Sequence, residues 1–378
     1  MGALTGQRAS SRRRLVVRAI LLASVGGLLA SLAFSRAPAF TDDFIAYWSA
    51  ARLLAGGGDP YDPSALLSMQ QSVGWRHATP LPTWYGPWIV AATVPLGLLP
   101  YWPARAGWMI LQVACLLASA AILWRLYEGQ AQSRRPFILA ATFAPSILGL
   151  VEGQISHLIL LSLAAFPVLV RARRDWLAGA VLFPLTAKPL TLYLIGLTVA
   201  VWAMRARRPK ILGGVVLTVA AGSIAAVLLN DAVFGEWAAF ARTYSPLTQR
   251  YTPTVGSVLR HLFGVDRLWL AYLPAALGVG WWLTTWQRYG ADMDWREHLP
   301  VLSLISLLTA PFAWSHDAVL LFPAVLQLAA AGWSRLDTAV WVLLNGLGAG
   351  LYPLLRYRQT GYLLYPLALL VWRKTRRL

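Results

Sequence analysis

Long apolar runs separated by short polar breaks recur along the whole chain. Runs of about 20 apolar residues cross a bilayer as helices, because a helix satisfies its own backbone hydrogen bonds inside lipid. The pattern therefore predicts an all-α, polytopic integral membrane protein with a single transmembrane domain over residues 1–378. The expected spans, about twelve in all, lie near 15–34, 104–124, 136–151, 154–170, 176–187, 189–204, 211–229, 266–287, 298–310, 317–333, 336–351 and 359–372.

The composition supports this class, with 58% hydrophobic and 13% charged residues. The formal charge of +18 does not indicate nucleic-acid binding, because the basic residues cluster in short loops such as Arg12–Arg14, Arg171–Arg174 and Arg205–Lys210. Such loops are topology signals under the positive-inside rule and sites of contact with anionic membrane lipids. A single cysteine excludes a disulfide framework or a cysteine metal site.

The basic loops give a consistent topology with both termini inside. Segments 35–103 and 230–265 then become extracytoplasmic loops. Within the first, residues 84–100 are apolar but short and interrupted by Pro87, Pro95 and Pro100, and each proline removes a helix hydrogen bond. We therefore expect this stretch to be re-entrant or to lie at the interface, rather than to cross.

The start of the same loop has a helical pattern of its own. Aromatic and small apolar residues recur at helical spacing over 44–55, which predicts an outward-facing amphipathic helix lying on the membrane. Gly56–Gly58 is expected to end it. Asp42 and Asp43 stand directly before it, in a chain with only 15 Asp and Glu residues.

The topology places several polar residues from distant parts of the sequence on the outer face. Lys188 is the informative one, because it stands alone between two short spans on the side that the charge rule disfavours. An ionisable residue at membrane depth is costly and indicates a functional site. We expect a single outward-facing pocket formed by Asp42, Asp43, Glu152, Gln154, Lys188 and His316.

At these residues the chain resembles glycosyltransferase family 87, the polyprenol-phosphate-mannose-dependent mannosyltransferases of the C-type glycosyltransferase superfamily. The stretches that carry the resemblance are Asp43–Ala51, Leu54–Asp62, Trp84–Pro87, Pro95–Pro100, Gly153–Gln154, Lys188–Pro189 and Trp314–Pro323. Two departures bear on the choice of donor or acceptor: Gly86 replaces a usual proline, and Asp317 stands where a second histidine is common.

The resemblance implies a C-type glycosyltransferase fold with its active site on the extracytoplasmic side of a bacterial cytoplasmic (inner) membrane. It implies transfer of a hexose, with mannose expected, from a polyprenyl-phosphate sugar donor to an envelope lipid or glycan acceptor. An inverting displacement needs one carboxylate base. Asp43 is the candidate, with Asp42 as a second catalytic candidate; the alternative for Asp43 is a helix N-cap.

Lys188 and His316 are the candidates for binding the donor phosphate. The alternatives are a snorkelling lysine at a span end and a satisfied interfacial histidine.

Gln154 and Glu152 suit hydrogen bonding to sugar or acceptor hydroxyls, and Tyr47, Trp84 and Tyr85 suit stacking on sugar or lining the lipid groove. Aromatic residues are also common at membrane interfaces without such a role. No cofactor and no metal are expected, because the two adjacent aspartates lack the further oxygen ligands that Mg²⁺ prefers.

Other functions remain open at this point. A transporter or polyprenyl-lipid flippase would also place ionisable groups at membrane depth, although the two halves of the chain do not repeat each other. A different C-type transferase or an inactive scaffold relative are further alternatives.

Overall fold

The computed structural model describes residues 42–244, 252–354 and 362–375, and every regular element in these ranges is helical. The elements are α2 (Phe44–Ala55), α3 (Pro63–Ser72), α4 (Pro87–Gly97), α5 (Tyr101–Leu126), α6 (Arg135–Thr142), α7 (Ala144–Glu152), α8 (Ser156–Arg171), α9 (Asp175–Ala180), η1 (Phe183–Ala187), α10 (Tyr193–Arg205), α11 (Lys210–Leu229), α12 (Val233–Thr243), α13 (Val255–Phe263), η3 (Leu268–Ala271), α14 (Leu273–Tyr289), η4 (Gly290–Asp292), α15 (Trp295–Thr309), η5 (Ser315–Leu321), α16 (Phe322–Ala330), α17 (Arg335–Leu354) and α18 (Leu364–Thr375). This confirms the predicted all-α class.

The longest apolar helices fit a bilayer. The 26 residues of α5 rise about 39 Å and the 20 residues of α11 about 30 Å, against a hydrocarbon core of about 30 Å. Both α6 and α7 are short, and they meet at an angle of 59° around the extended residue Phe143. Among the described helices two can cross a membrane by length and composition, or three if the bent pair is one span.

Most of the other predicted spans correspond to shorter or divided helices, whereas 336–351 lies within the 20-residue α17. Residues 154–170 form α8 and residues 189–204 form α10, whereas 317–333 is divided between η5 and α16. A helix of 10–17 residues rises only about 15–26 Å, so the predicted count of about twelve crossings stays a prediction. The first predicted span, 15–34, lies outside the described residues.

The predicted helix after the two aspartates forms as α2 and ends at Gly56, followed by Gly57 in the left-handed conformation with φ of 74°. Its position differs from the prediction. It is a buried helix that packs against α3, α4 and α5, and of its side chains only Arg52 is well exposed. Its apolar residues cover almost the whole circumference, so protein rather than lipid surrounds them.

Within residues 84–100 the chain forms α4 (Pro87–Gly97), an 11-residue helix with Pro87 in its first turn and Pro95 inside it. It rises about 16 Å, roughly half of the hydrocarbon core. It packs mainly on α2 and α11, and the Trp88 indole donates to the Thr186 hydroxyl at 3.0 Å. The short helix thus forms part of the wall around α2.

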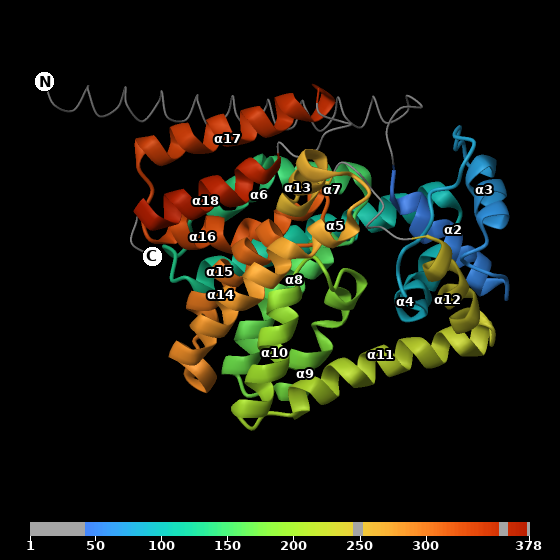
Figure 1. The fold of residues 1–378 in the computed structure, drawn as a ribbon, viewed down its shortest axis with the longest axis horizontal. Coiled ribbons are helices and arrows are strands. Elements are labelled where there is room, and N and C mark those ends of the chain that lie inside the picture. Colours follow the sequence, from blue (N-terminus) through green and yellow to red (C-terminus); the bar gives the residue numbers. More distant parts are fainter. Residues whose placement is uncertain (1–41, 245–251, 355–361, 376–378) are drawn as a thin grey trace, which may run out of the picture.

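The elements separate towards two ends of the molecule. Figure 1 shows α2, α3, α4 and α12 together at the right, whereas α16 and α18 lie at the left. Basic loops contact one another away from α2: Arg208 pairs with Asp175, and Arg296 pairs with Glu128 at 2.5 Å.

Candidate functional site

The break between α7 and α8 positions the first acidic residue of the site. The Asp43 amide donates to the Glu152 carbonyl at 2.9 Å, which fixes the start of α2 against the end of α7. Gly153 allows this contact in two ways: its φ is 71°, and a Cβ atom there would stand 2.8 Å from the Phe44 Cβ. The turn therefore requires glycine and delivers Gln154 beside Asp43.

Asp43 stands at the N-cap position of α2, but its side chain makes no capping hydrogen bond. Its carboxylate instead accepts a hydrogen bond from the Gln154 Nε2. The Gln154 Oε1 accepts from the Tyr47 hydroxyl and from the Lys188 Nζ, each at 3.1 Å. One amide therefore links the carboxylate to the ammonium group.

Lys188 follows η1 and reaches into the same cluster. Its Nζ lies 2.7 Å from the Asp317 Oδ1, 3.1 Å from the His316 Nε2 and 3.3 Å from the Ser156 Oγ. Asp317 is itself fixed, because it accepts from Ser156 at 2.7 Å and from the Trp314 amide at 2.9 Å. In the sequence, Asp317 was recognised only as a departure from a family pattern, although its position next to His316 was a signal of a role in the site.

His316 is held from its other side by Glu152. The His316 Nδ1 lies 2.6 Å from the Glu152 Oε2, and both side chains are buried, at 3% and 8% exposure. The predicted sugar-binding carboxylate therefore contacts the predicted phosphate-binding histidine. This geometry is that of a carboxylate that fixes the orientation and tautomer of an imidazole.

Asp42 turns away from this cluster. Its carboxylate accepts from the Tyr101 hydroxyl at 2.5 Å and pairs with the Arg105 Nε at 2.9 Å. Arg105 also donates to the Val151 carbonyl at 2.8 Å, so Asp42 joins α5 to the end of α7. The two aspartates thus have different surroundings, and sequence reasoning missed both partners because Tyr101 and Arg105 lie far along the chain.

The three predicted aromatic residues also separate. The hydroxyls of Tyr47 and Tyr85 are 2.9 Å apart, which places both next to Gln154. Trp84 is half-buried and packs against Phe240 of α12 in a second apolar cluster, with ring centroids 5.6 Å apart. Tyr47 and Tyr85 therefore belong to the polar cluster, and Trp84 does not.

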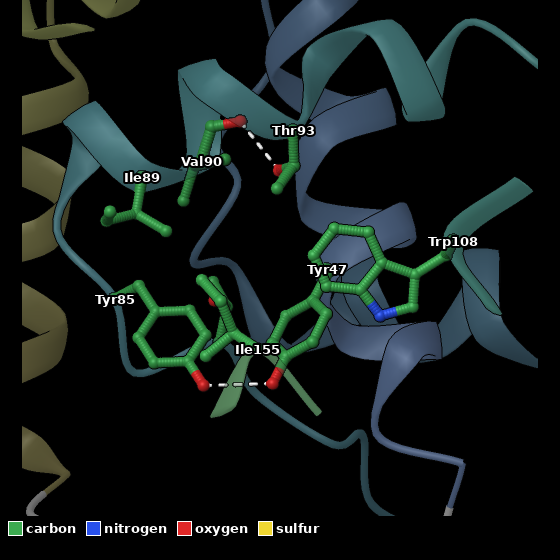
Figure 2. Close-up of a pocket in the computed structure, with 8 residues that line it drawn as sticks. Tyr47, Tyr85, Ile89, Val90, Thr93, Trp108 and Ile155 are labelled. Atoms are coloured by element: carbon green, nitrogen blue, oxygen red, sulfur yellow. Dashed lines mark hydrogen bonds between the residues drawn. The ribbon is translucent and has the colours of Figure 1, made fainter. Parts of the chain in front are cut away.

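Figure 2 shows how the two tyrosine rings stand against an apolar wall. The rings border a cavity of about 10 Å³, closed by Ile89, Trp108 and Ile155. This volume is at the lower limit for one water molecule. Beside this wall the two hydroxyls pair with each other, and the Tyr47 hydroxyl also donates to Gln154.

The surroundings of Asp43 change its acidity. Burial raises the pKa of Asp43 well above its ordinary value, and the neighbouring Glu152 carboxylate adds to the rise, whereas Lys188 acts against it. A carboxylate whose pKa is raised binds a proton more readily. Asp43 is therefore well suited to accept a proton.

Asp43, Glu152 and His316 also offer three potential metal ligands, whose donor atoms lie within 4.8 Å of one another. Glu152 already contacts the His316 Nδ1, and the Lys188 ammonium already contacts its Nε2. Both ring nitrogens are thus engaged, and Lys188 brings a positive charge to the place where a cation would bind. The expected independence from metal stays a prediction.

Comparison with known proteins gives a family match and one distant relative. The profile of Glycosyltransferase family 87 matches residues 83–311, more than half of the chain. The match includes Glu152, Gln154 and Lys188, while Asp43 and His316 lie outside it.

A relative from Mycobacterium tuberculosis (strain CDC 1551 / Oshkosh) is described as a polyprenol-phosphate-mannose-dependent alpha-(1-2)-phosphatidylinositol pentamannoside mannosyltransferase. It is 25% identical over 269 residues, which are 66% of this chain and 58% of the relative. The chain thus spans a little over half the length of that protein. No solved structure matches the chain.

Proposed function

Because the chain belongs to glycosyltransferase family 87, we propose that it transfers a hexose, with mannose expected, from a polyprenyl-phosphate sugar to an envelope lipid or glycan. The observation that carries this proposal is the buried chain of contacts from Asp43 through Gln154 to Lys188 and His316. In this chain of contacts the proposed proton acceptor lies close to the two proposed phosphate-binding groups, as glycosyl transfer from a phosphate requires.

The donor class rests on three observations. The relative's description names polyprenol-phosphate-mannose as the donor. In this chain, the Lys188 ammonium lies 3.1 Å from the His316 Nε2, and charge-assisted hydrogen bonds from an ammonium group suit phosphate oxygens. A lipid-linked donor also suits a protein whose described apolar helices fit a bilayer.

The proposed reaction is a single displacement with inversion at the anomeric carbon. Asp43 takes the proton of the acceptor hydroxyl, and the acceptor oxygen forms a bond to the anomeric carbon. The bond from this carbon to the phosphate oxygen breaks, and its electron pair leaves on the polyprenyl phosphate. Lys188 and His316 stabilise the charge that develops there.

The geometry modifies two of the sequence-based roles. Glu152 acts as a positioning residue for His316, since its carboxylate contacts the Nδ1 and leaves the Nε2 facing Lys188. Asp42 acts as a structural anchor, since Arg105 and Tyr101 occupy its oxygens. Asp43 is then the base, acting on the extracytoplasmic face of a bacterial inner membrane.

The test compares Asp43→Asn with wild type in nanodiscs that contain radiolabelled polyprenyl-phosphate-mannose and a cell-envelope lipid extract. Loss of the base is expected to lower the transfer rate by about 10²–10⁴-fold. Asp231→Asn is the matched control, because Asp231 is an exposed carboxylate just before α12.

Transfer by wild type and Asp231→Asn but not by Asp43→Asn supports both the reaction and the base. Equal transfer by all three proteins would rule out Asp43 as the base. Absence of transfer with every envelope acceptor and every polyprenyl-phosphate hexose, combined with movement of the labelled lipid between leaflets, would replace the transferase by a flippase.

A further inference from the structure

A second, larger cavity lies between α14, α15 and α18. Its volume is about 330 Å³, within the usual range for small-molecule sites. Trp281, Trp282 and Trp286 form one side, and the rings of the last two stack with centroids 5.6 Å apart. The indole of Trp282 is fixed by a 2.9 Å hydrogen bond to Thr198. The aromatic wall is therefore in part anchored to α10.

The rest of the lining combines uncharged side chains, among them Met293 and Leu302, with basic ones. Arg288, His298 and Arg373 line the cavity together with one acidic residue, Glu297. Arg373 is only 9% exposed and donates to the neutral Gln327 side chain. Among the described residues, neither Arg288 nor Arg373 has a carboxylate within 4.0 Å. The Glu297 carboxylate acts on Arg373 only from beyond this distance, so it balances the two guanidinium groups only in part. A buried guanidinium that is incompletely balanced is costly, which makes the cavity electrostatically suited to an anion.

The cavity is remote from the transferase cluster. Its residues on α15 lie in the first half of that helix, and His298 is separated from Thr309 by about 16 Å of helix rise. His316 follows only after this helix has ended. The α18 helix, which contributes Arg373, lies at the end of the molecule opposite α2 (Figure 1). The basic and aromatic composition is that of a membrane interface rather than of the outer site.

We infer that this cavity binds the phosphate headgroup of an anionic phospholipid on the cytoplasmic side, with Arg288 and Arg373 on the phosphate and the tryptophans against the glycerol and upper acyl chains. Basic pockets between helices at this membrane face bind anionic headgroups. Tryptophan presents an apolar body and a polar N–H, which suits the boundary between headgroup and hydrocarbon.

The test uses the full-length protein in a neutral detergent, with dioleoylphosphatidylglycerol as the probe and zwitterionic dioleoylphosphatidylcholine as the reference lipid. Native mass spectrometry measures how much of each lipid stays bound. Arg288→Gln, Arg373→Gln and the double variant are compared with the control Arg205→Gln/Arg207→Gln, which removes two exposed basic residues outside the cavity. Inorganic phosphate is added as a competitor in a separate arm.

Wild type and the control are expected to prefer phosphatidylglycerol, and the double variant is expected to lose about tenfold in that preference. Arg373→Gln also removes a buried contact, so Arg288→Gln, whose side chain is exposed, tests the proposal if the former fails to fold. Equal lipid preference in Arg288→Gln and in the control would overturn the proposal. Displacement of the lipid by millimolar inorganic phosphate would also overturn it and assign the cavity to a soluble anion.

Discussion

Removing the Asp317 carboxylate is expected to show how much it stabilises the buried Lys188 ammonium. Its carboxylate is 2.7 Å from the Lys188 ammonium, and the two side chains are 1% and 11% exposed. Removal of one partner from a buried ion pair costs about 3–5 kcal/mol, because the other charge is left without compensation. Gln154, Ser156 and His316 still contact Lys188. We therefore expect Asp317→Asn to lower the free energy of unfolding by about 3 kcal/mol, the lower end of that range.

The double variant Lys188→Met/Asp317→Asn separates the ion pair from the individual side chains. We expect it to recover most of the lost stability, because no uncompensated ammonium remains. It is not expected to recover sugar transfer, because the phosphate-binding charge is gone. The free energies are measured by equilibrium unfolding in mixed micelles of neutral detergent and dodecyl sulfate. Additive losses in the double variant would refute the argument that these two charges compensate each other.

Three further outcomes follow from the cluster. Burial and Glu152 raise the pKa of Asp43, so the transfer rate should fall as the pH decreases through this raised pKa, which lies above the ordinary aspartate value of about 4. At higher pH the rate should stay level. A rate that does not change with pH down to pH 4 would contradict this prediction. Extensive dialysis against EDTA should leave the rate unchanged, and a loss that Mg²⁺ or Mn²⁺ restores would show that Asp43, Glu152 and His316 bind a metal. Glu152→Gln should lower kcat about 10-fold or more while the donor KM changes little, measured by initial rates; an effect confined to acceptor KM would return Glu152 to the sugar-binding role.

The sequence predicted which residues form helices better than it predicted what those helices pack against. Residues 44–55 form the expected helix because their spacing and the following glycines define it locally. Their burial was not predictable, since it depends on α4 and α5, which cover a face that looks exposed in isolation. The number of membrane crossings could not be predicted either, because length alone does not decide whether a helix of 10–17 residues crosses the membrane.

For the polar cluster, the sequence likewise predicted which residues come together but not which of them pair. Breaks between apolar runs indicated that Asp43, Gln154, Lys188 and His316 share a face, because every second crossing returns the chain to the same side. Pairing within the cluster depends on side-chain directions, which no spacing rule provides. Asp42 and Asp43 are adjacent in sequence, yet one contacts Arg105 and the other Gln154.

Gln154 lies between the Asp43 carboxylate and the Lys188 ammonium, the two groups between which negative charge moves in the proposed reaction. Its amide N–H faces the Asp43 carboxylate, and its carbonyl faces the Lys188 ammonium, so the two ends of one side chain match opposite charges. In the proposed reaction Asp43 becomes neutral as it accepts a proton, while the departing phosphate gains one negative charge. The total charge of the buried site then stays constant, and negative charge moves from the Asp43 end to the Lys188 and His316 end. Moving a charge between two prepared positions costs far less than creating one in a low-dielectric site. The raised pKa of Asp43 acts in the same direction, because burial that disfavours its charged form promotes the proton transfer that removes this charge.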